Sequence, residues 1–407
     1  MKSMKKLVLV ALVLLASVVV LAGCKNDSVP EVPKYTVTFD TDGGSAVDFQ
    51  SVEIGKMATK PTDPTLEGSW FLGWYGDKEG TKEFDFSIPI TDNTKVYAKW
   101  SYKLHSIPQI LTDYSSPNNT DSKWTYVAFG DWPQTIKAAD VTVDRTKSRQ
   151  MGMFTYYLGS DSNYYVEAKE RASGSGSQYK YSDGTQVGQK GASKKWFKVE
   201  PIVWRILNKD YAETGTALLL AENILTGGIK WDDSNNNYKG SNIRKWLNGN
   251  SGSKEVSDYK GDAGFLQTAF TETAGNFIAP TIVDNSAQST IDAAGNLSAS
   301  KYTCANTKDK IFLLSEQEAT KEEYGFAEYD VSGRGNTRIR VTTDYAKATG
   351  AYQASEASSG GMWWLRSPSY SFDYSARSIN DYGNAYNSGS VVATYGGVVP
   401  ALSISLQ

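Results

Sequence analysis

Short runs in which apolar and polar residues alternate recur along the chain from residue 35. This period of two is that of half-buried β-strands, and it predicts a β-rich α+β protein. Helical patterns occupy two short stretches, residues 241–247, with Ser241 as the N-cap, and residues 265–270. The predicted strands are residues 35–40, 52–54, 95–100, 126–130, 196–207, 217–221 and 310–315.

The first 23 residues follow a different pattern. Lys2, Lys5 and Lys6 precede an apolar run from Leu7 to Leu21, which is the organisation of a secretory signal peptide. The run closes on Leu-Ala-Gly followed by Cys24, which resembles the lipobox of bacterial lipoproteins. That resemblance implies cleavage before Cys24 and acylation of this cysteine, so that lipid attaches the protein to a membrane. The alternative is an ordinary signal peptide with an incidental cysteine.

Residues 24–34 are polar and contain two prolines, which is typical of a tether. We therefore expect a lipid-anchored protein of the cell envelope, at the outer membrane or cell surface. Removal of residues 1–23 leaves 407 − 23 = 384 residues, long enough for two or three domains. The net charge of −3 and the lack of a basic cluster argue against a nucleic-acid partner. We expect a monomer.

The two cysteines and one histidine limit the possible chemistry. With Cys24 lipidated, Cys304 has no partner within the chain, so no intrachain disulfide is expected. No basic residue adjoins Cys304, which favours a buried, inert thiol over a reactive one. His105, the single histidine, lies in a predicted linker, which argues against zinc sites and Ser-His-Asp triads. We predict no cofactor and no metal.

Residues 35–100 carry three motifs in a fixed order: Phe-Asp-x-x-Gly-Gly from Phe39, Phe-Leu-Gly-Trp-Tyr from Phe71, and Val-Tyr-Ala-Lys-Trp from Val96. This order resembles the internalin-type B-repeat, also called the Listeria-Bacteroides repeat. The resemblance implies a small ubiquitin-like β module that acts as a spacer on bacterial surfaces. A receptor-binding role is the alternative.

Residues 101–122 are irregular in pattern and predict a linker. The remaining residues, 123–407, predict one larger domain, in which the Gly- and Ser-rich stretch 172–193 is expected to be an exposed loop. Within this domain, Ser315 and Glu318 have the spacing of a capping box, which predicts the start of a further helix.

Two apolar blocks near the C-terminus, residues 361–368 and 396–402, enclose a stretch dominated by Tyr, Ser, Asn, Asp and Gly. This composition is typical of binding surfaces, because Tyr offers contact area with few rotors while Ser, Asn and Gly offer adaptable hydrogen bonds. The blocks therefore predict a fixed frame, and residues 369–395, here the Tyr-rich segment, predict a surface that binds a protein or glycan. A merely hydrophilic run of loops is the alternative.

The motifs at residues 129–134, 199–207, 242–247, 311–315 and 363–368 together resemble a bacterial family of surface domains with the C-type-lectin-like fold of the formylglycine-generating-enzyme type. They are also similar to the variable lipoproteins of diversity-generating retroelements, the treponemal variable protein among them. The resemblance implies a structural frame of Trp363, Trp364, Arg366 and Pro400. It implies ligand-binding positions at Tyr370, Phe372, Asp373, Tyr374, Asn380, Asp381, Tyr382, Asn384, Tyr386, Asn387 and Tyr395.

Two departures from this family are visible. Val399 stands where the family usually has an arginine, which implies a lost ion pair or hydrogen bond at that corner. The enzymes of this fold need a pair of cysteines, and here Cys304 alone remains, so we expect no oxidase activity and a non-catalytic domain.

Three alternatives stay open. The first is a structural envelope lipoprotein without a dedicated ligand. The second is an envelope glycan hydrolase using paired carboxylates, for which the candidates are Glu316, Glu318, Glu322, Glu323 and Asp344, although a solvated helix face is favoured for the glutamates. The third is calcium bound by Asp373, Asn380, Asp381 and Asn384, which lack regular acidic spacing. Core positions are favoured for Trp363 and Trp364, and an internal ion pair for Arg366.

Overall fold

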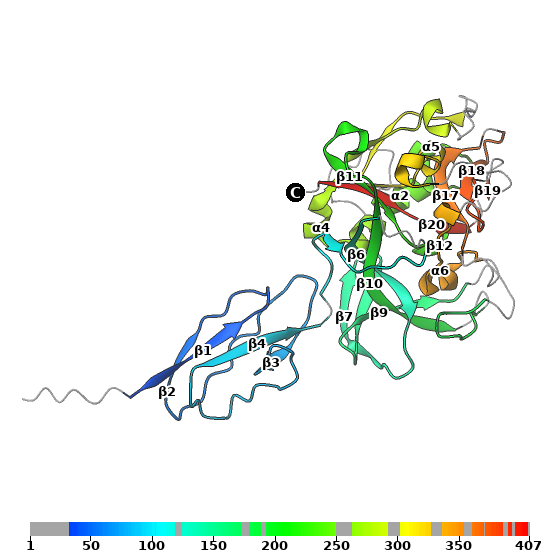
Figure 1. The fold of residues 1–407 in the computed structure, drawn as a ribbon. Coiled ribbons are helices and arrows are strands. Elements are labelled where there is room, and N and C mark those ends of the chain that lie inside the picture. The colour runs from blue at the N-terminus through cyan, green and yellow to red at the C-terminus, as the bar shows by residue number, and fades with distance from the viewer. Residues whose placement is uncertain are drawn as a thin grey trace, which may run out of the picture. The chain divides into compact units, whose positions relative to one another are not determined.

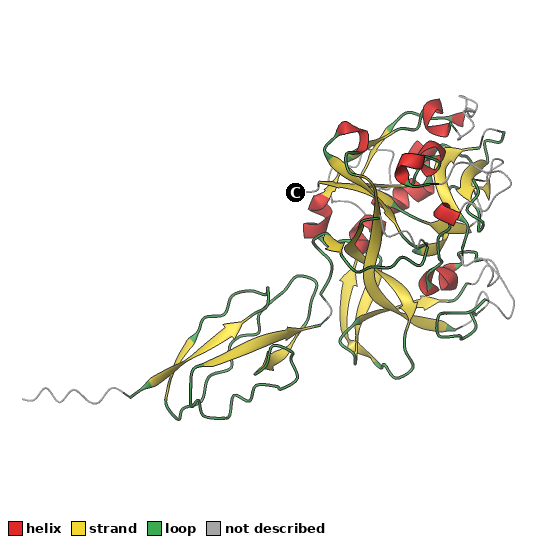
Figure 2. Ribbon diagram, in the orientation of Figure 1, coloured by secondary structure: helices red, strands yellow, loops and turns green. Residues whose placement is uncertain are grey.

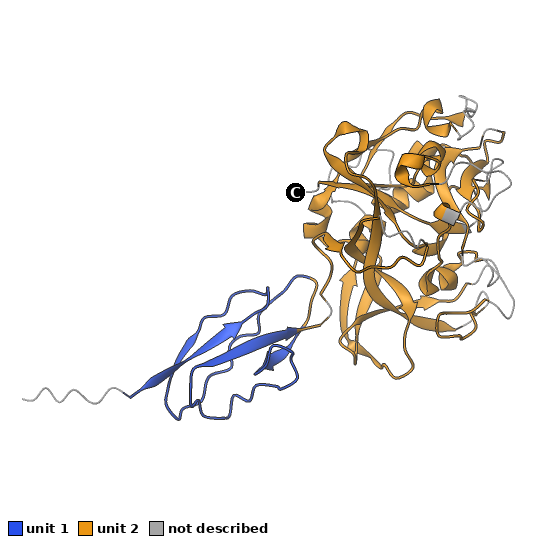
Figure 3. Ribbon diagram, viewed as in Figure 1, with its two compact units in different colours: residues 1–67, 71–99 blue, residues 68–70, 100–407 orange. Residues whose placement is uncertain are grey.

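In the computed structural model, the chain folds into two compact units (Figure 3). One unit runs up to Glu67 and includes Phe71–Lys99, and the other comprises Gly68–Trp70 and Trp100–Gln407. The structure describes residues 32–101, 103–118, 124–171, 179–188, 193–249, 263–291, 302–326, 336–353, 360–369, 371–385, 390–392 and 395–405. The predicted signal peptide, Cys24 and most of the tether lie outside these residues. No helix in the described ranges combines the length and apolar character that crossing a membrane requires.

The first unit is a four-stranded sheet with the order β2-β1-β4-β3 (Figure 1). Its central strands pair in parallel, with Val37 opposite Thr94, and the buried side chains alternate along each strand as the sequence pattern predicts. Trp74 fills the core against Phe39, at 5.0 Å between ring centroids. The strands are β1 (Lys34–Asp40), β2 (Gln50–Glu53), β3 (Phe71–Tyr75) and β4 (Thr94–Trp100).

The second unit is organised around a ten-stranded sheet. Strands dominate this unit, and its helices are short (Figure 2). Its longest strand, β10 (Lys194–Asn208), pairs with β6, β9 and β11, and its Trp204 indole donates a hydrogen bond of 2.7 Å to the Phe129 carbonyl. The other strands of this sheet are β5 (Gln109–Leu111), β6 (Tyr126–Ile136), β7 (Val143–Met151), β8 (Phe154–Gly159), β9 (Tyr164–Lys169), β11 (Thr216–Ala221), β13 (Ile278–Ala279), β16 (Ile311–Phe312) and β21 (Ala401–Ser405).

A five-stranded sheet with the order β12-β20-β17-β18-β19 carries the C-terminal blocks. The chain passes from β20 through Val399 and Pro400 directly into β21, so the last block joins the two sheets of this unit. The strands are β12 (Thr226–Lys230), β17 (Trp363–Pro368), β18 (Ser375–Ile379), β19 (Ser390–Val391) and β20 (Tyr395–Val398), and a separate pair is formed by β14 (Thr281–Val283) and β15 (Thr307–Asp309).

The α-helices described in this unit are short, and all except the one that begins at Phe265 are capped by a Ser or Thr hydroxyl. Ser241 accepts a hydrogen bond from the Arg244 amide, and Ser315 forms a capping box with Glu318, so both sequence predictions are confirmed. The helices are α2 (Asn242–Asn248), α3 (Phe265–Ala269), α4 (Glu272–Phe277), α5 (Glu316–Ala319) and α6 (Asp344–Thr349), with 3₁₀ turns η1 (Tyr211–Glu213), η2 (Tyr238–Gly240), η3 (Ala287–Thr290), η5 (Glu322–Tyr324) and η6 (Asn336–Arg338).

The β-rich class is confirmed, but three local predictions are wrong. The stretch 101–122 is not simply a linker, since β5 lies within it and pairs with β6. The stretch 172–193 is not simply an exposed loop, because Tyr179, Tyr181 and Val187 are buried in the core. The strand predicted for residues 310–315 is confined to β16, and the chain then turns into α5.

Candidate functional site

The Tyr-rich segment is supported by a buried hairpin, β17–β18. Trp363 and Trp364 are fully buried, with Trp363 opposite Ile379, and the Trp363 indole donates to the Arg338 carbonyl at 3.2 Å. Pro400 and Val399 are buried as well, so an apolar side chain occupies the position where the resembled family has arginine.

Two buried ion pairs fix α5 against this hairpin. Arg366 donates to Glu318 at 2.5 Å, and Arg377 donates to Glu316 at 2.5 Å. Burial opposes ionisation of Glu318, but the nearby Arg366 outweighs it and holds the pKa of this carboxyl below its ordinary value. A solvated helix face was favoured for these glutamates, and this is wrong for Glu316 and Glu318.

Glu322 and Glu323 are exposed, as the solvated face predicts. Asp344 is buried at the start of α6, where its carboxylate accepts hydrogen bonds from the Ser182 amide and, at 3.1 Å, from the Ile136 amide. Each buried carboxylate among the hydrolase candidates is therefore occupied by a structural partner.

Among the described residues of the Tyr-rich segment, the longest exposed run lies in a tight turn at residues 371–374, here called the aromatic turn. Phe372 and Tyr374 are 44% and 46% exposed, and their rings stack with centroids 5.1 Å apart. Asn236 fixes the backbone of this turn through hydrogen bonds. Its side-chain amide donates to the carbonyls of Phe372 and Ser375 at 2.8 and 2.9 Å, and its backbone amide donates to the carbonyl of Asp373 at 2.7 Å.

A second turn follows β18. Tyr382 is 45% exposed, whereas Asn380, Asp381 and Asn384 are half-buried. The Asn380 side chain accepts hydrogen bonds from the amides of Tyr382 and Asn384 at 3.0 and 2.9 Å, so it shapes the turn. Burial raises the pKa of the Asp381 carboxyl.

The sequence predicted that the Tyr-rich segment forms one outward surface, and this prediction is wrong. Ser375–Ile379 is buried throughout, because it forms strand β18 between β17 and β19. Tyr370, Tyr386 and Asn387 lie outside the described residues, and of Tyr395 the structure describes only the backbone, in β20. Among the residues described, no three or more His, Cys, Asp and Glu side chains gather into a group that could hold a metal.

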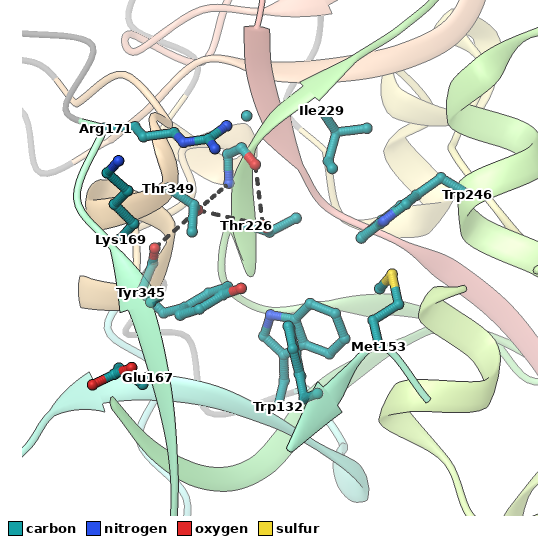
Figure 4. A pocket seen from close by; sticks show the side chains of 14 residues that line it. Trp132, Met153, Glu167, Lys169, Arg171, Thr226, Ile229, Trp246, Tyr345 and Thr349 are labelled. Atoms are coloured by element: carbon teal, nitrogen blue, oxygen red, sulfur yellow. Dashed lines mark hydrogen bonds between the residues drawn. The ribbon is translucent and has the colours of Figure 1, made fainter. Parts of the chain in front are cut away.

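A pocket of about 320 Å³ opens elsewhere in the second unit (Figure 4). Sequence reasoning did not find it. Trp132 and Trp246 belong to motifs that were recognised only as markers of the fold, and their convergence depends on strand β6 and helix α2 meeting in space. The lining residues are Trp132, Met153, Phe154, Glu167, Ala168, Lys169, Arg171, Thr226, Gly227, Gly228, Ile229, Trp246, Tyr345 and Thr349.

Close approach of β12 and α6 forms one wall of the pocket, and glycine makes it possible. A Cβ on Gly227 would lie 1.9 Å from the Ala351 amide nitrogen, and Gly228 has φ of +70°. The Thr349 hydroxyl accepts from the Gly227 amide at 2.9 Å, which fixes the two elements together.

Comparison with known families supports the repeat. Residues 35–99 match the Listeria-Bacteroides repeat domain, which confirms the repeat predicted at residues 35–100. Residues 214–406 match a family described as a domain of unknown function, DUF6273.

The curated relatives are similar over short stretches. A putative membrane protein of Evansella cellulosilytica is 39% identical over 87 residues, which is 21% of this chain and 13% of the relative. A putative Gly-rich membrane protein of the same organism is 37% identical over 78 residues, 19% of this chain and 9% of the relative. Internalin H of Listeria monocytogenes is 33% identical over 101 residues, 24% of this chain and 16% of the relative. The chain thus spans less than a fifth of the length of each.

Proposed function

We propose that this protein is a lipid-anchored, non-catalytic binding protein of the cell surface, which contacts a protein or glycan ligand through the aromatic turn. The observation that carries the proposal is the stacked pair Phe372 and Tyr374, exposed on a turn that Asn236 holds in place. Exposed aromatic rings on a rigid support are the usual anchors of an interface, since little conformational entropy is lost on binding.

The proposed location at the cell surface is supported by the N-terminal part of the chain. Residues 35–99 match the Listeria-Bacteroides repeat domain, and the relatives include a protein named as a membrane protein and an internalin. With a lipid on Cys24, the repeat would serve as a spacer between the membrane and the second unit. Attachment at the outer membrane or cell surface belongs to this proposal.

The fold assignment of the second unit is part of the same proposal. We take it to be C-type-lectin-like, with buried Trp363, Trp364, Arg366 and Pro400 as the frame and the Tyr-rich segment as the variable part. The absence of catalysis is supported by Glu316 and Glu318, whose carboxylates face arginine partners rather than solvent. Sequences of the same locus in sibling strains test diversification, which requires changes clustered within residues 369–395.

The binding proposal is tested with the full chain on arrays of glycans and of cell-surface proteins. A Phe372→Ser, Tyr374→Ser double variant should weaken binding to its ligands by about tenfold or more, the usual effect of removing interface anchors. The matched control is Ile282→Ser, because Ile282 is an equally apolar side chain, 61% exposed on β14. Binding that is unchanged in the double variant contradicts the proposal, and arrays without any ligand favour the structural lipoprotein instead.

A further inference from the structure

Four aromatic rings line the inner part of the pocket of Figure 4, and charged side chains line its edge. Trp132 forms its fully buried back wall, with the ring of Phe154 4.9 Å away and those of Tyr345 and Trp246 6.2 and 6.1 Å away, both edge to face. These rings come from β6, β8, α6 and α2, so the shape is set by the whole domain. A cavity of about 150 Å³ is enough for benzene. The volume of about 320 Å³ therefore admits one six-membered ring with substituents.

One hydroxyl group points into this interior. Figure 4 shows Tyr345 directed towards the space between Trp132 and Thr226. Within the described part of the chain its phenol oxygen has no hydrogen-bond partner, and burial raises the pKa of Tyr345, so the group remains a hydrogen-bond donor. A ligand with a polar substituent would satisfy it.

The rim carries excess positive charge. Lys169 is the last residue of β9 and Arg171 lies two residues beyond it. Both are exposed, and neither forms an ion pair with any residue that the structure describes. The one carboxylate in the lining, Glu167, is already shared by Arg145 and by Lys194, the latter at 2.8 Å. The Arg171 amide donates to the Ala348 carbonyl at 2.7 Å, which fixes this end of the strand beside α6.

We propose that this pocket binds a small cyclic carboxylic acid, whose ring lies among Trp132, Phe154 and Trp246 while its carboxylate pairs with Lys169 and Arg171. A guanidinium and an ammonium at one rim match a carboxylate, and the aromatic walls match the apolar face of a ring. Two sources share this chemistry, an acidic sugar and an aromatic acid. The site shares no lining residue with the aromatic turn, so it is independent of the binding proposed there.

The test is calorimetric titration of the full chain, in neutral detergent and low-salt buffer free of phosphate, with two matched pairs of probes. Glucuronate is compared with glucose, and phenylacetate with 2-phenylethanol. We expect the acid of one pair to bind at least about tenfold more tightly than its neutral partner, and salt to weaken it. The pair that shows the preference identifies the source.

Lys169 and Arg171 are exposed, so their substitution does not disturb the core, and Tyr345→Phe removes only a hydroxyl while keeping the buried ring. Lys169→Gln and Arg171→Gln should each weaken the acid about three- to tenfold, and together they should abolish the preference over the neutral probe. Tyr345→Phe should weaken binding about fivefold. Lys147→Gln removes the same charge from an exposed site on β7 outside the pocket and should change nothing.

Three results would overturn the inference: equal binding of acid and neutral probes, a preference that survives in the Lys169, Arg171 double variant, or no binding of any probe at concentrations near 10 mM, roughly the weakest affinity worth calling a site. Loss of acid binding with intact array binding separates this site from the aromatic turn. Failure of the array experiment leaves the calorimetric result unaffected.

Discussion

Arg205 on β10 and Glu222, which directly follows the neighbouring strand β11, form a fully buried ion pair. The Arg205 Nε and Nη2 atoms donate to the two Glu222 oxygens at 3.0 and 2.6 Å, and neither side chain has any exposed surface. Ser116 donates to the same carboxylate. Arg340 is buried nearby, so one carboxylate serves two arginines in this part of the core.

We predict that Glu222→Ala lowers the free energy of unfolding of the second unit by about 3–5 kcal/mol, because it leaves buried arginines without their carboxylate. Urea unfolding followed by tryptophan fluorescence measures the change. Glu323→Gln is the control, since Glu323 pairs with Lys321 at 3.0 Å in an exposed position, and it should cost less than about 1 kcal/mol. Similar losses in both variants would contradict the importance of burial.

Stability should also fall in acid. Burial opposes ionisation of Glu222, but Arg340 and Arg205 outweigh it and hold the pKa of this carboxyl below its ordinary value of 4.5. A folded pKa below the unfolded one stabilises the fold above the unfolded pKa, and this stability is lost as pH falls through the folded pKa. Unfolding in urea at pH 7, 5, 4 and 3 measures the loss. Glu222→Gln should flatten the profile below pH 4.5, and an unchanged slope would refute this origin.

Gly130 tests whether backbone conformation and packing act together. Its φ is +69°, and a Cβ there would lie 2.4 Å from Phe270 and 2.9 Å from the Ala269 carbonyl. Gly130→Ala should therefore destabilise the unit by roughly 2–5 kcal/mol, from strain and overpacking combined. Gly184 has φ of +84° with no atom within 4 Å, so Gly184→Ala should cost only about 1 kcal/mol of strain. Equal thermal shifts in the two variants would exclude the packing contribution.

Cys304 should react slowly in the folded protein. It is half-buried, and burial raises the pKa of its thiol, so little thiolate is present at neutral pH. Alkylation by iodoacetamide, followed by mass spectrometry, should be at least about tenfold slower in native than in urea-unfolded protein. Rapid native labelling would instead mark Cys304 as reactive.

Cys24 should carry the membrane anchor. In cells fed labelled palmitate, the full chain should incorporate label and partition into detergent, whereas Cys24→Ser should do neither, because at least two acyl chains are needed for stable anchoring. Cys304→Ser is the matched control and should still be labelled. Label retained in Cys24→Ser would show that the lipobox resemblance is misleading.

The local features of this protein were predictable because they depend on neighbouring residues. The alternation along residues 35–40 is that of β1, and the Ser315 and Glu318 spacing gave the start of α5. The same helix shows the limit. Its polar pattern favoured solvent, yet Glu316 and Glu318 are buried, because Arg377 and Arg366 approach from strands about 50 to 60 residues away.

The sequence by itself determined the β-rich class, the repeat at residues 35–99 and the caps of α2 and α5, all of which follow from motifs or from periods of a few residues. Only the tertiary structure decided that Ser375–Ile379 is buried while Phe372 and Tyr374 are exposed, and that four rings from four elements enclose the pocket beside Lys169 and Arg171. Composition records which side chains are present. Burial and ion pairing depend on contacts between segments distant in the chain, and these arise only when the sheets close on their core.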